Sequence, residues 1–248
     1  MPGRAARTWY SRRVTIRERL ARLDWGALEA SLWERGYALT PPVLTAKECS
    51  ELARLYGDDR RFRKRVDMAR LRFGVGDYKY FADPLPAPVR ELRVHGYRHL
   101  APIANRWLEA YGERSKFPRS LTGLRALCAR HGQTKPTPLL LRYRAGGYNR
   151  LHQDLYGEIA FPLQMTCFLS RTGKDFLGGA FLLVESEFRA QSRGEALDPA
   201  RGALVIFPTR ERPVRGARRL RRARMRHGLA TVVSGSRYAL GVIFHDAR

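Results

Sequence analysis

The residues best suited to chemistry are His152 and Asp154, which stand two positions apart in the segment LHQD. On an extended chain alternate side chains point to the same side, so this imidazole and this carboxylate face one place. A second histidine, His227, follows 73 residues after Asp154 and is predicted at the start of a strand, HGLATVV. Two histidines and one carboxylate suit non-haem Fe(II) with open coordination positions, although the same donors also bind a hydrolytic Zn²⁺.

Arg237 separates these two alternatives. It stands ten residues after His227, in a segment that reads as a strand. Arg237 shares one face of that strand with Ala239, Gly241 and Ile243, so the arginine lies beside small side chains. Small neighbours leave room for a ligand carboxylate, which a guanidinium binds through two parallel hydrogen bonds. The pattern therefore favours iron with a carboxylate co-substrate.

At these residues the chain resembles the Fe(II)/2-oxoglutarate-dependent dioxygenases, whose signature is HxD, a distant histidine, and an arginine or lysine about ten residues further on. The likeness spans about residues 142–247. Segments such as YRAGGYNRLHQDLYGEIAFPLQ and RHGLATVVSGSR are similar to a prokaryotic branch of oxygenases acting on alkylated DNA. The spacing from Tyr143 to HxD is also similar to that of the AlkB-type DNA demethylases.

The resemblance implies a role for each residue. His152, Asp154 and His227 are expected to hold Fe(II), which 2-oxoglutarate chelates through its C1 carboxylate and 2-oxo group. Arg237 is expected to bind the distal carboxylate of 2-oxoglutarate and Tyr143 to contact the same molecule, while dioxygen takes the remaining position on the metal. Decarboxylation to succinate and CO2 is then coupled to hydroxylation of a substrate C–H bond, which on an N-methyl group gives demethylation of alkylated nucleic acid.

Two other functions remain open on the sequence. Similar cores serve prolyl hydroxylases, so the substrate is alternatively a protein side chain or a small molecule. A catalytically silent nucleic-acid-binding protein that keeps the same scaffold is a further alternative, against which the intact set of candidate ligands argues. His245, which shares the strand face of Arg237, is expected at the far end of the same pocket.

The elements around these residues change character along the chain. Short apolar runs separated by Gly, Pro and Ser begin near Leu139 and predict a β-sandwich or barrel. The resemblance implies a double-stranded β-helix (jelly roll), so the expected class is α+β with a mainly β core. We expect residues 1–115 to form a mostly helical N-terminal region packed on a core of residues 116–248, together one structural unit.

Individual elements of the first half are also predicted. Residues 1–40 read as a basic arm and one helix, followed by a short strand over 37–44. Thr45 and Glu48 form a capping box that starts the next helix, which should end near Gly57. Residues 58–72 are dominated by charge, and a further helix is expected over 89–111.

Charge gives a second indication of function. Lys and Arg total 47 against 23 Asp and Glu, a net charge of +24 that should attract polyanions. Arginines are densest in residues 210–226, which we expect to form a loop near the pocket mouth that holds nucleic-acid phosphates. Three separated cysteines, no signal sequence and no apolar run of membrane-spanning length predict a cytoplasmic protein without a membrane partner.

Overall fold

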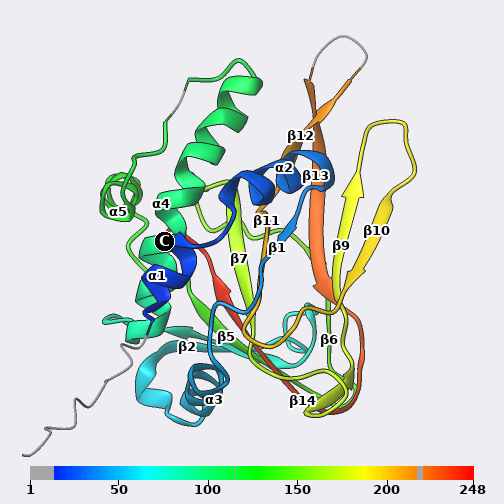
Figure 1. Ribbon diagram of the computed structural model, residues 1–248. Helices are drawn as coiled ribbons and strands as arrows, with labels where there is room; N and C mark the ends of the chain where they lie inside the picture. Colours follow the sequence, from blue (N-terminus) through cyan, green and yellow to red (C-terminus); the bar gives the residue numbers. More distant parts are fainter. Residues whose placement is uncertain (1–13, 115, 217–219) are drawn as a thin grey trace, which may run out of the picture.

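The computed structural model describes residues 14–114, 116–216 and 220–248. Two antiparallel sheets face each other, and a layer of helices covers the outer side of the larger sheet (Figure 1). Within this described part of the chain, no helix is both long and apolar enough to cross a membrane.

The larger sheet has the strand order β1-β11-β7-β14-β5-β4-β2, with β8 paired to one end of β14. Its strands are β1 (Ala38–Leu39), β2 (Phe62–Asp67), β4 (Asp77–Phe81), β5 (Leu139–Arg144), β7 (Leu163–Phe168), β8 (Phe176–Gly178), β11 (Leu204–Pro208) and β14 (Val232–Val242). Strand β7 lies inside the sheet with both faces covered, so all six of its residues are buried. Its sequence LQMTCF alternates: Leu163, Met165 and Cys167 belong to the core on the helix side, and Gln164 and Thr166 line the cavity on the other face.

The smaller sheet has the order β10-β9-β13-β6-β3, with β12 also paired to β13. Its strands are β3 (Gly74–Val75), β6 (Tyr148–His152), β9 (Phe181–Ser186), β10 (Arg193–Leu197), β12 (Glu211–Arg215) and β13 (Leu220–Leu229). The inner face of this sheet lies against the inner face of the larger one. Residues that project into the space between the sheets are therefore placed by strands from both.

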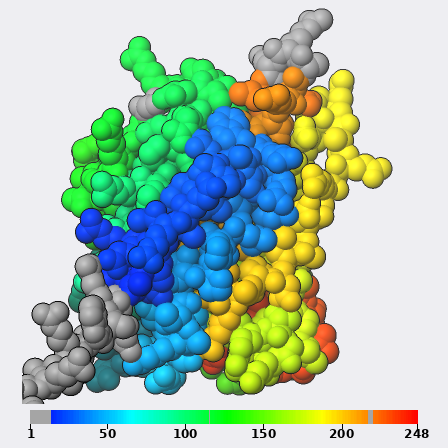
Figure 2. All heavy atoms as spheres, in the orientation of Figure 1, coloured from blue at the N-terminus to red at the C-terminus, as the bar shows by residue number. Residues whose placement is uncertain are grey.

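Five α-helices and two short 3₁₀ turns complete the described residues. They are α1 (Ile16–Ala21), α2 (Trp25–Arg35), α3 (Ala46–Arg54), η1 (Leu55–Gly57), η2 (Asp59–Arg61), α4 (Ala87–Ala110) and α5 (Leu121–Arg130). Figure 2 shows the N-terminal helices, in dark blue, lying diagonally across this face of the molecule. The helical N-terminal layer expected from the sequence is thus present.

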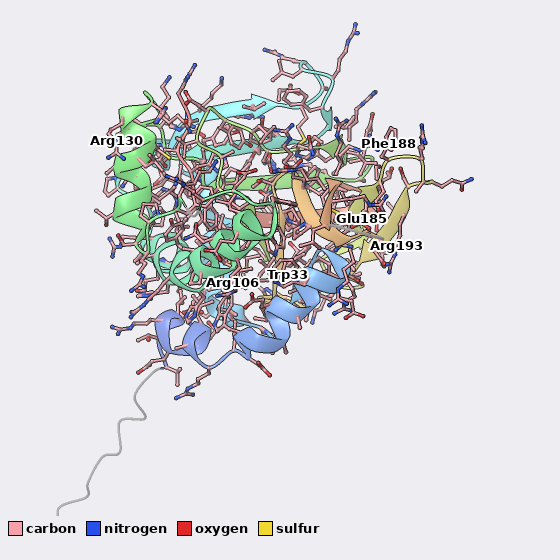
Figure 3. All side chains as sticks on the ribbon, turned by 90° about the horizontal axis from the view of Figure 1, so that it is seen from above. Trp33, Arg106, Arg130, Glu185, Phe188 and Arg193 are labelled. Carbon is pink, nitrogen blue, oxygen red and sulfur yellow. The ribbon has the colours of Figure 1, made fainter. Side chains whose placement is uncertain are left out.

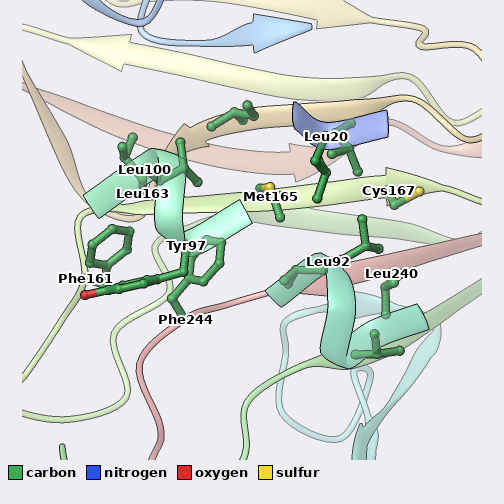
Figure 4. Packing of buried hydrophobic residues seen from close by; sticks show 14 of the residues in the cluster. Leu20, Leu92, Tyr97, Leu100, Phe161, Leu163, Met165, Cys167, Leu240 and Phe244 are labelled. Atoms are coloured by element: carbon green, nitrogen blue, oxygen red, sulfur yellow. The ribbon is translucent and has the colours of Figure 1, made fainter. Parts of the chain in front are cut away.

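The main core lies between α4 and the outer face of the larger sheet. Leucines and aromatics of α4 pack against β7 and the end of β14, as the labelled Leu92, Tyr97, Met165 and Phe244 show (Figure 4). A Cβ at Gly96 would come within 2.6 Å of the Met165 Cε, so glycine there allows close approach of helix and strand. The outer face of the sheet is thereby closed, which leaves the space between the sheets for the site.

Several sequence predictions can be compared directly with the elements. The helix expected over 89–111 is α4, and the capping box of Thr45 and Glu48 is present at the start of α3. The single helix expected in residues 1–40 is wrong, because Asp24 caps a second helix and divides it into α1 and α2. The strand expected over 37–44 is only β1, and the expected basic arm, residues 1–13, lies outside the described residues.

The loop predicted for the arginine-rich run at 210–226 is wrong. Residues 217–219 lie outside the described part of the chain, but on either side of them the run forms β12 and β13, which pair antiparallel, and His227 stands near the end of β13 rather than at the start of a strand. In β13 the buried Ala223, Met225 and His227 alternate with exposed arginines, the period of a half-buried strand. Dense charge on the outer face concealed this alternation in the sequence.

Candidate metal and co-substrate site

The structure brings His152, Asp154 and His227 together between the two sheets. His152 ends β6 and pairs directly with His227 of β13, so both imidazoles project from one face with ring centres 4.2 Å apart. Asp154 follows β6, and its Oδ2 lies 3.1 Å from His227 Nε2 while its Oδ1 lies 3.7 Å from His152 Nε2. One donor atom from each residue lies within 4.8 Å of the others, a spacing that one metal ion can bridge.

Neighbouring groups fix the orientation of these donors. The His152 Nδ1 lies 2.8 Å from the carbonyl of Arg150, so Nδ1–H donates to that oxygen and Nε2 keeps its lone pair for the metal. The Tyr156 hydroxyl donates to Asp154 Oδ1 at 2.7 Å, which leaves Oδ2 toward His227. Gln153 donates to the carbonyls of Arg210 and Met225, tying the HxD segment to the base of the β12–β13 hairpin.

Electrostatics favours the protonation states that bind metals. Burial raises the pKa of Asp154, but the neighbouring His227 and His152 and the hydroxyl of Tyr156 outweigh it, so the net pKa lies well below the ordinary value. Burial and the adjacent His227 lower the pKa of His152. At neutral pH the carboxylate is therefore ionised and the His152 ring is neutral, as metal coordination requires.

Arg237 lies in the same cavity as a buried and unpaired cation. Its side chain is 3% exposed, and among the described residues nothing accepts a hydrogen bond from its guanidinium or forms an ion pair with it. The guanidinium carbon lies 5.1 and 5.7 Å from the ring centres of Phe168 and Phe176. Burial lowers the pKa of Arg237 to about 10, so it stays protonated at neutral pH. A buried cation without a partner is costly, and an anionic ligand that binds it compensates the charge.

The cavity that contains these groups measures about 460 Å³. Arg237 pairs directly with Tyr143 across β14 and β5, and both line the cavity, as do Ala239 and Gly241 on the same face of β14. The expected alternation in this strand is confirmed. His245, expected at the far end, does not line the cavity: it is fully buried, and its Nδ1 accepts a hydrogen bond from the Phe161 amide.

Several further residues line this cavity or hold its donors beyond those that the motifs indicate. Tyr156 stands two positions after Asp154, so the spacing that pairs His152 with Asp154 also indicates this tyrosine. Gln164 and Thr166 line the cavity from the inner face of β7, and Gln164 Nε2 is buried without a hydrogen-bond partner in the described structure. Their alternation with the apolar core residues of the segment LQMTCF is the sequence signal that could have placed both on the opposite face.

The arginines of 210–226 do not contribute to the cavity lining. None of the described residues from 210 to 226 lines it, and the hairpin of β12 and β13 extends away beside β9 and β10 (Figure 1). Several of its arginines are paired within the protein: Arg212 with Glu185 at 2.5 Å, Arg221 with Glu187 at 3.2 Å, and Arg222 with Glu113. The run therefore adjoins the cavity only at its base, where Gln153 bonds the Arg210 and Met225 carbonyls, and none of its described arginines lines the cavity.

Comparison with solved structures identifies the fold. A prolyl-4-hydroxylase from Pseudomonas putida matches 90% of this chain and 99% of its own, with a TM-score of 0.55 and 14% identity. A 2OG-Fe(II) oxygenase family oxidoreductase from Burkholderia pseudomallei matches 91% of each chain, with a TM-score of 0.51 and 16% identity. The expected α+β jelly-roll fold with a β majority is confirmed.

Comparison of sequences identifies the family. Uncharacterized proteins from two strains of Mycobacterium tuberculosis are 47% identical over 167 residues, which is 67% of this chain and 72% of theirs. The sequence model of one family, described as oxygenases catalysing oxidative methylation of damaged DNA, matches residues 76–247, which contain all five predicted site residues. The chain is therefore an oxygenase and belongs to this family.

Proposed function

We propose that the chain is an Fe(II)- and 2-oxoglutarate-dependent dioxygenase that oxidatively demethylates alkylated nucleic acid. His152, Asp154 and His227 hold the ferrous ion, and the donor set fits because two imidazoles and one carboxylate leave coordination positions open. The observation that carries the proposal is the unpaired Arg237 in the same cavity as these three donors. When bound, the iron supplies oxidation of a C–H bond by dioxygen, coupled to decarboxylation of 2-oxoglutarate.

Each side chain of the site has a task in this reaction. The Arg237 guanidinium binds the distal carboxylate of 2-oxoglutarate, beside the buried Tyr143. Phe168 and Phe176 exclude water from the resulting ion pair, which strengthens it. Tyr156 holds Asp154 in one orientation, and the Arg150 carbonyl fixes the tautomer of His152.

The substrate part of the proposal has two supports. The family description names damaged DNA, and the net charge of +24 suits a polyanion. Oxidation of an N-methyl group gives an N-hydroxymethyl group, which breaks down to formaldehyde and the unmodified base. Demethylation therefore follows from hydroxylation without any further catalytic residue.

The experiment combines two products. The purified chain with Fe(II), ascorbate and 2-oxoglutarate should release succinate, and methylated oligonucleotides should lose the mass of one CH2 group in matching amount. His152→Ala should abolish both, whereas His131→Ala, a histidine paired with Glu158 outside the cavity, should leave them unchanged. Succinate release without any change of a nucleic acid would remove the substrate from the proposal, and no succinate from the wild type would remove the chemistry.

A further inference from the structure

The turn between β2 and β3 places two side chains at the site cavity. Arg72 and Phe73 both line it, and the Phe73 side chain is 46% exposed. The turn is held by hydrogen bonds from the amides of Phe73 and Leu71 to the Met68 carbonyl, at 2.9 and 3.2 Å. Met68 itself is fully buried beneath the turn. The backbone of the tip is thus preorganised, which lowers the cost of ordering this turn when a ligand binds.

The backbone of Arg72 is in a conformation that favours glycine. Its φ is +58°, and the Phe73-to-Met68 and Arg72-to-Ala69 hydrogen bonds form the pattern in which glycine usually occupies this position. Among the described non-glycine residues only Arg72 and Arg189 have a positive φ. A side chain with a Cβ is strained there. Strain of this kind, in a residue that lines the functional cavity, suggests that the side chain itself is needed.

No other part of the described structure uses the Arg72 guanidinium. It forms no hydrogen bond or ion pair with any described residue, and the same is true of the guanidinium of Arg150. The Arg150 amide donates to the Phe73 carbonyl at 2.8 Å, so the two arginines belong to adjacent backbone segments at the cavity. Two cations without partners beside one opening favour an anionic ligand.

The same opening also has an apolar rim. Besides Phe73, the cavity-lining Leu151 and Leu155 are 37% and 45% exposed. A nucleic acid offers both a planar base for an exposed aromatic ring and phosphates for guanidinium groups. An acidic peptide would satisfy the cations but would leave the aromatic ring without a planar partner. The combination therefore favours a nucleic-acid strand.

We propose that the β2–β3 turn is a substrate-reading element, in which Phe73 stacks on a base and Arg72, with Arg150, holds phosphates of the strand that enters the cavity. This inference rests on the proposed function, because it takes nucleic acid as the substrate. The proposed phosphate contacts therefore lie at two arginines of the cavity, and not at the arginine-rich hairpin.

Arg72→Gly is a sharp test because its expected effects on stability and on binding are opposite. Glycine relieves the strained φ, so the thermal midpoint should stay equal or rise. Affinity for a short fluorescein-labelled single-stranded DNA should fall roughly 10-fold, and the slope of log K against log salt should lessen by about 0.7 for one lost phosphate contact. Phe73→Ala should weaken binding by about 5- to 150-fold while leaving the salt slope unchanged.

Arg189→Gly is the matched control. Arg189 has a φ of +60°, lies over the ring of Phe188 at the turn between β9 and β10, and does not line the cavity (Figure 3, where Phe188 is labelled). This substitution removes the same charge and the same backbone strain, so the thermal midpoint should again stay equal or rise, while DNA affinity and succinate release stay at wild-type values. An equal loss of DNA affinity in this variant would overturn the proposal, since any arginine would then suffice.

Two further outcomes are decisive. Unchanged DNA affinity in both Arg72→Gly and Phe73→Ala would overturn the proposal even if the wild type releases succinate. Competition by a poly-glutamate peptide that depends on Arg72 but not on Phe73 would also overturn it and indicate an acidic protein partner. Absence of succinate from the wild type would contradict the proposed dioxygenase chemistry, whereas the DNA titrations would still report on the turn.

Discussion

Replacing Arg237 by methionine should stabilise the ligand-free protein and yet weaken its binding of 2-oxoglutarate. In the free protein the guanidinium is a buried cation, and burial lowers its pKa to about 10 from 12.5. Keeping it charged at neutral pH therefore costs about 3 kcal/mol of folding free energy. Methionine removes this cost but also removes contacts with the rings of Phe168 and Phe176, worth about 0.5–1 kcal/mol each.

The net gain should be about 1–2 kcal/mol, which raises the thermal midpoint by about 2–8 °C in a chain of this size. Because the folded pKa of Arg237 lies below its unfolded value, the penalty is fully present below pH 10 and fades as the pH rises through that value. The difference in midpoint between Arg237→Met and the wild type should therefore stay constant from pH 7 to pH 9. Differential scanning fluorimetry without 2-oxoglutarate measures it.

Binding of 2-oxoglutarate should change in the opposite direction. Without Arg237 the distal carboxylate would be buried without a partner, which costs about 3–5 kcal/mol, or roughly 100- to 4,000-fold in Kd. Calorimetric titration of the Mn²⁺-loaded protein measures this. Arg93→Met is the matched control: Arg93 is equally buried but bonded to Asp246 and two carbonyls, so its loss should destabilise the fold. An Arg237→Met protein less stable than the wild type, or with unchanged 2-oxoglutarate affinity, would refute the reasoning.

Two further predictions concern neighbours of the site. Tyr156→Phe should weaken Fe(II) binding about 10- to 100-fold, because Asp154 loses the hydroxyl that orients it. Tyr78→Phe removes a hydroxyl from the same cavity wall that is not bonded to Asp154, so it should leave Fe(II) binding unchanged. Equal losses of Fe(II) affinity in both variants would count against this orienting role. Burial lowers the pKa of His245 from 6.5 to about 4 in the folded protein. As the pH falls, the imidazole is therefore protonated in the unfolded chain before it is protonated in the folded one. About 3 kcal/mol of the free energy of unfolding should be lost between pH 6.5 and pH 4. His245→Asn keeps a hydrogen-bond acceptor but has no titrating group, so its urea midpoint should fall less over this pH range than that of the wild type. An equally steep fall in the variant would contradict the role given to His245.

The sequence predicts the candidate site better than the architecture around it. HxD places His152 and Asp154 on one face of an extended segment, and the alternation around Arg237 places that residue beside small side chains. Both patterns depend only on local strand geometry, which the sequence determines within a few residues. The pairing of His152 with His227 joins segments 75 positions apart, and no local pattern reveals it.

Elements in charged segments were the hardest to predict. Strand β2 lies at the edge of the larger sheet, and only one of its six residues is buried, so its sequence FRKRVD shows no apolar period. The hairpin of β12 and β13 is hidden in the same way by arginines on its outer face. The turn that carries Arg72 and Phe73 follows β2 directly, and its position at the cavity depends on pairing of Gly74 with Asn149 of β6.

Anaerobic equilibrium dialysis with Fe(II) tests the central claim most directly, namely that three side chains converge on one metal ion. We predict one Fe(II) per chain in the wild type and in His131→Ala, and loss of this binding in Asp154→Ala and His227→Ala. Full binding of Fe(II) by Asp154→Ala with an unchanged Kd would contradict the account, because the iron would then be held elsewhere.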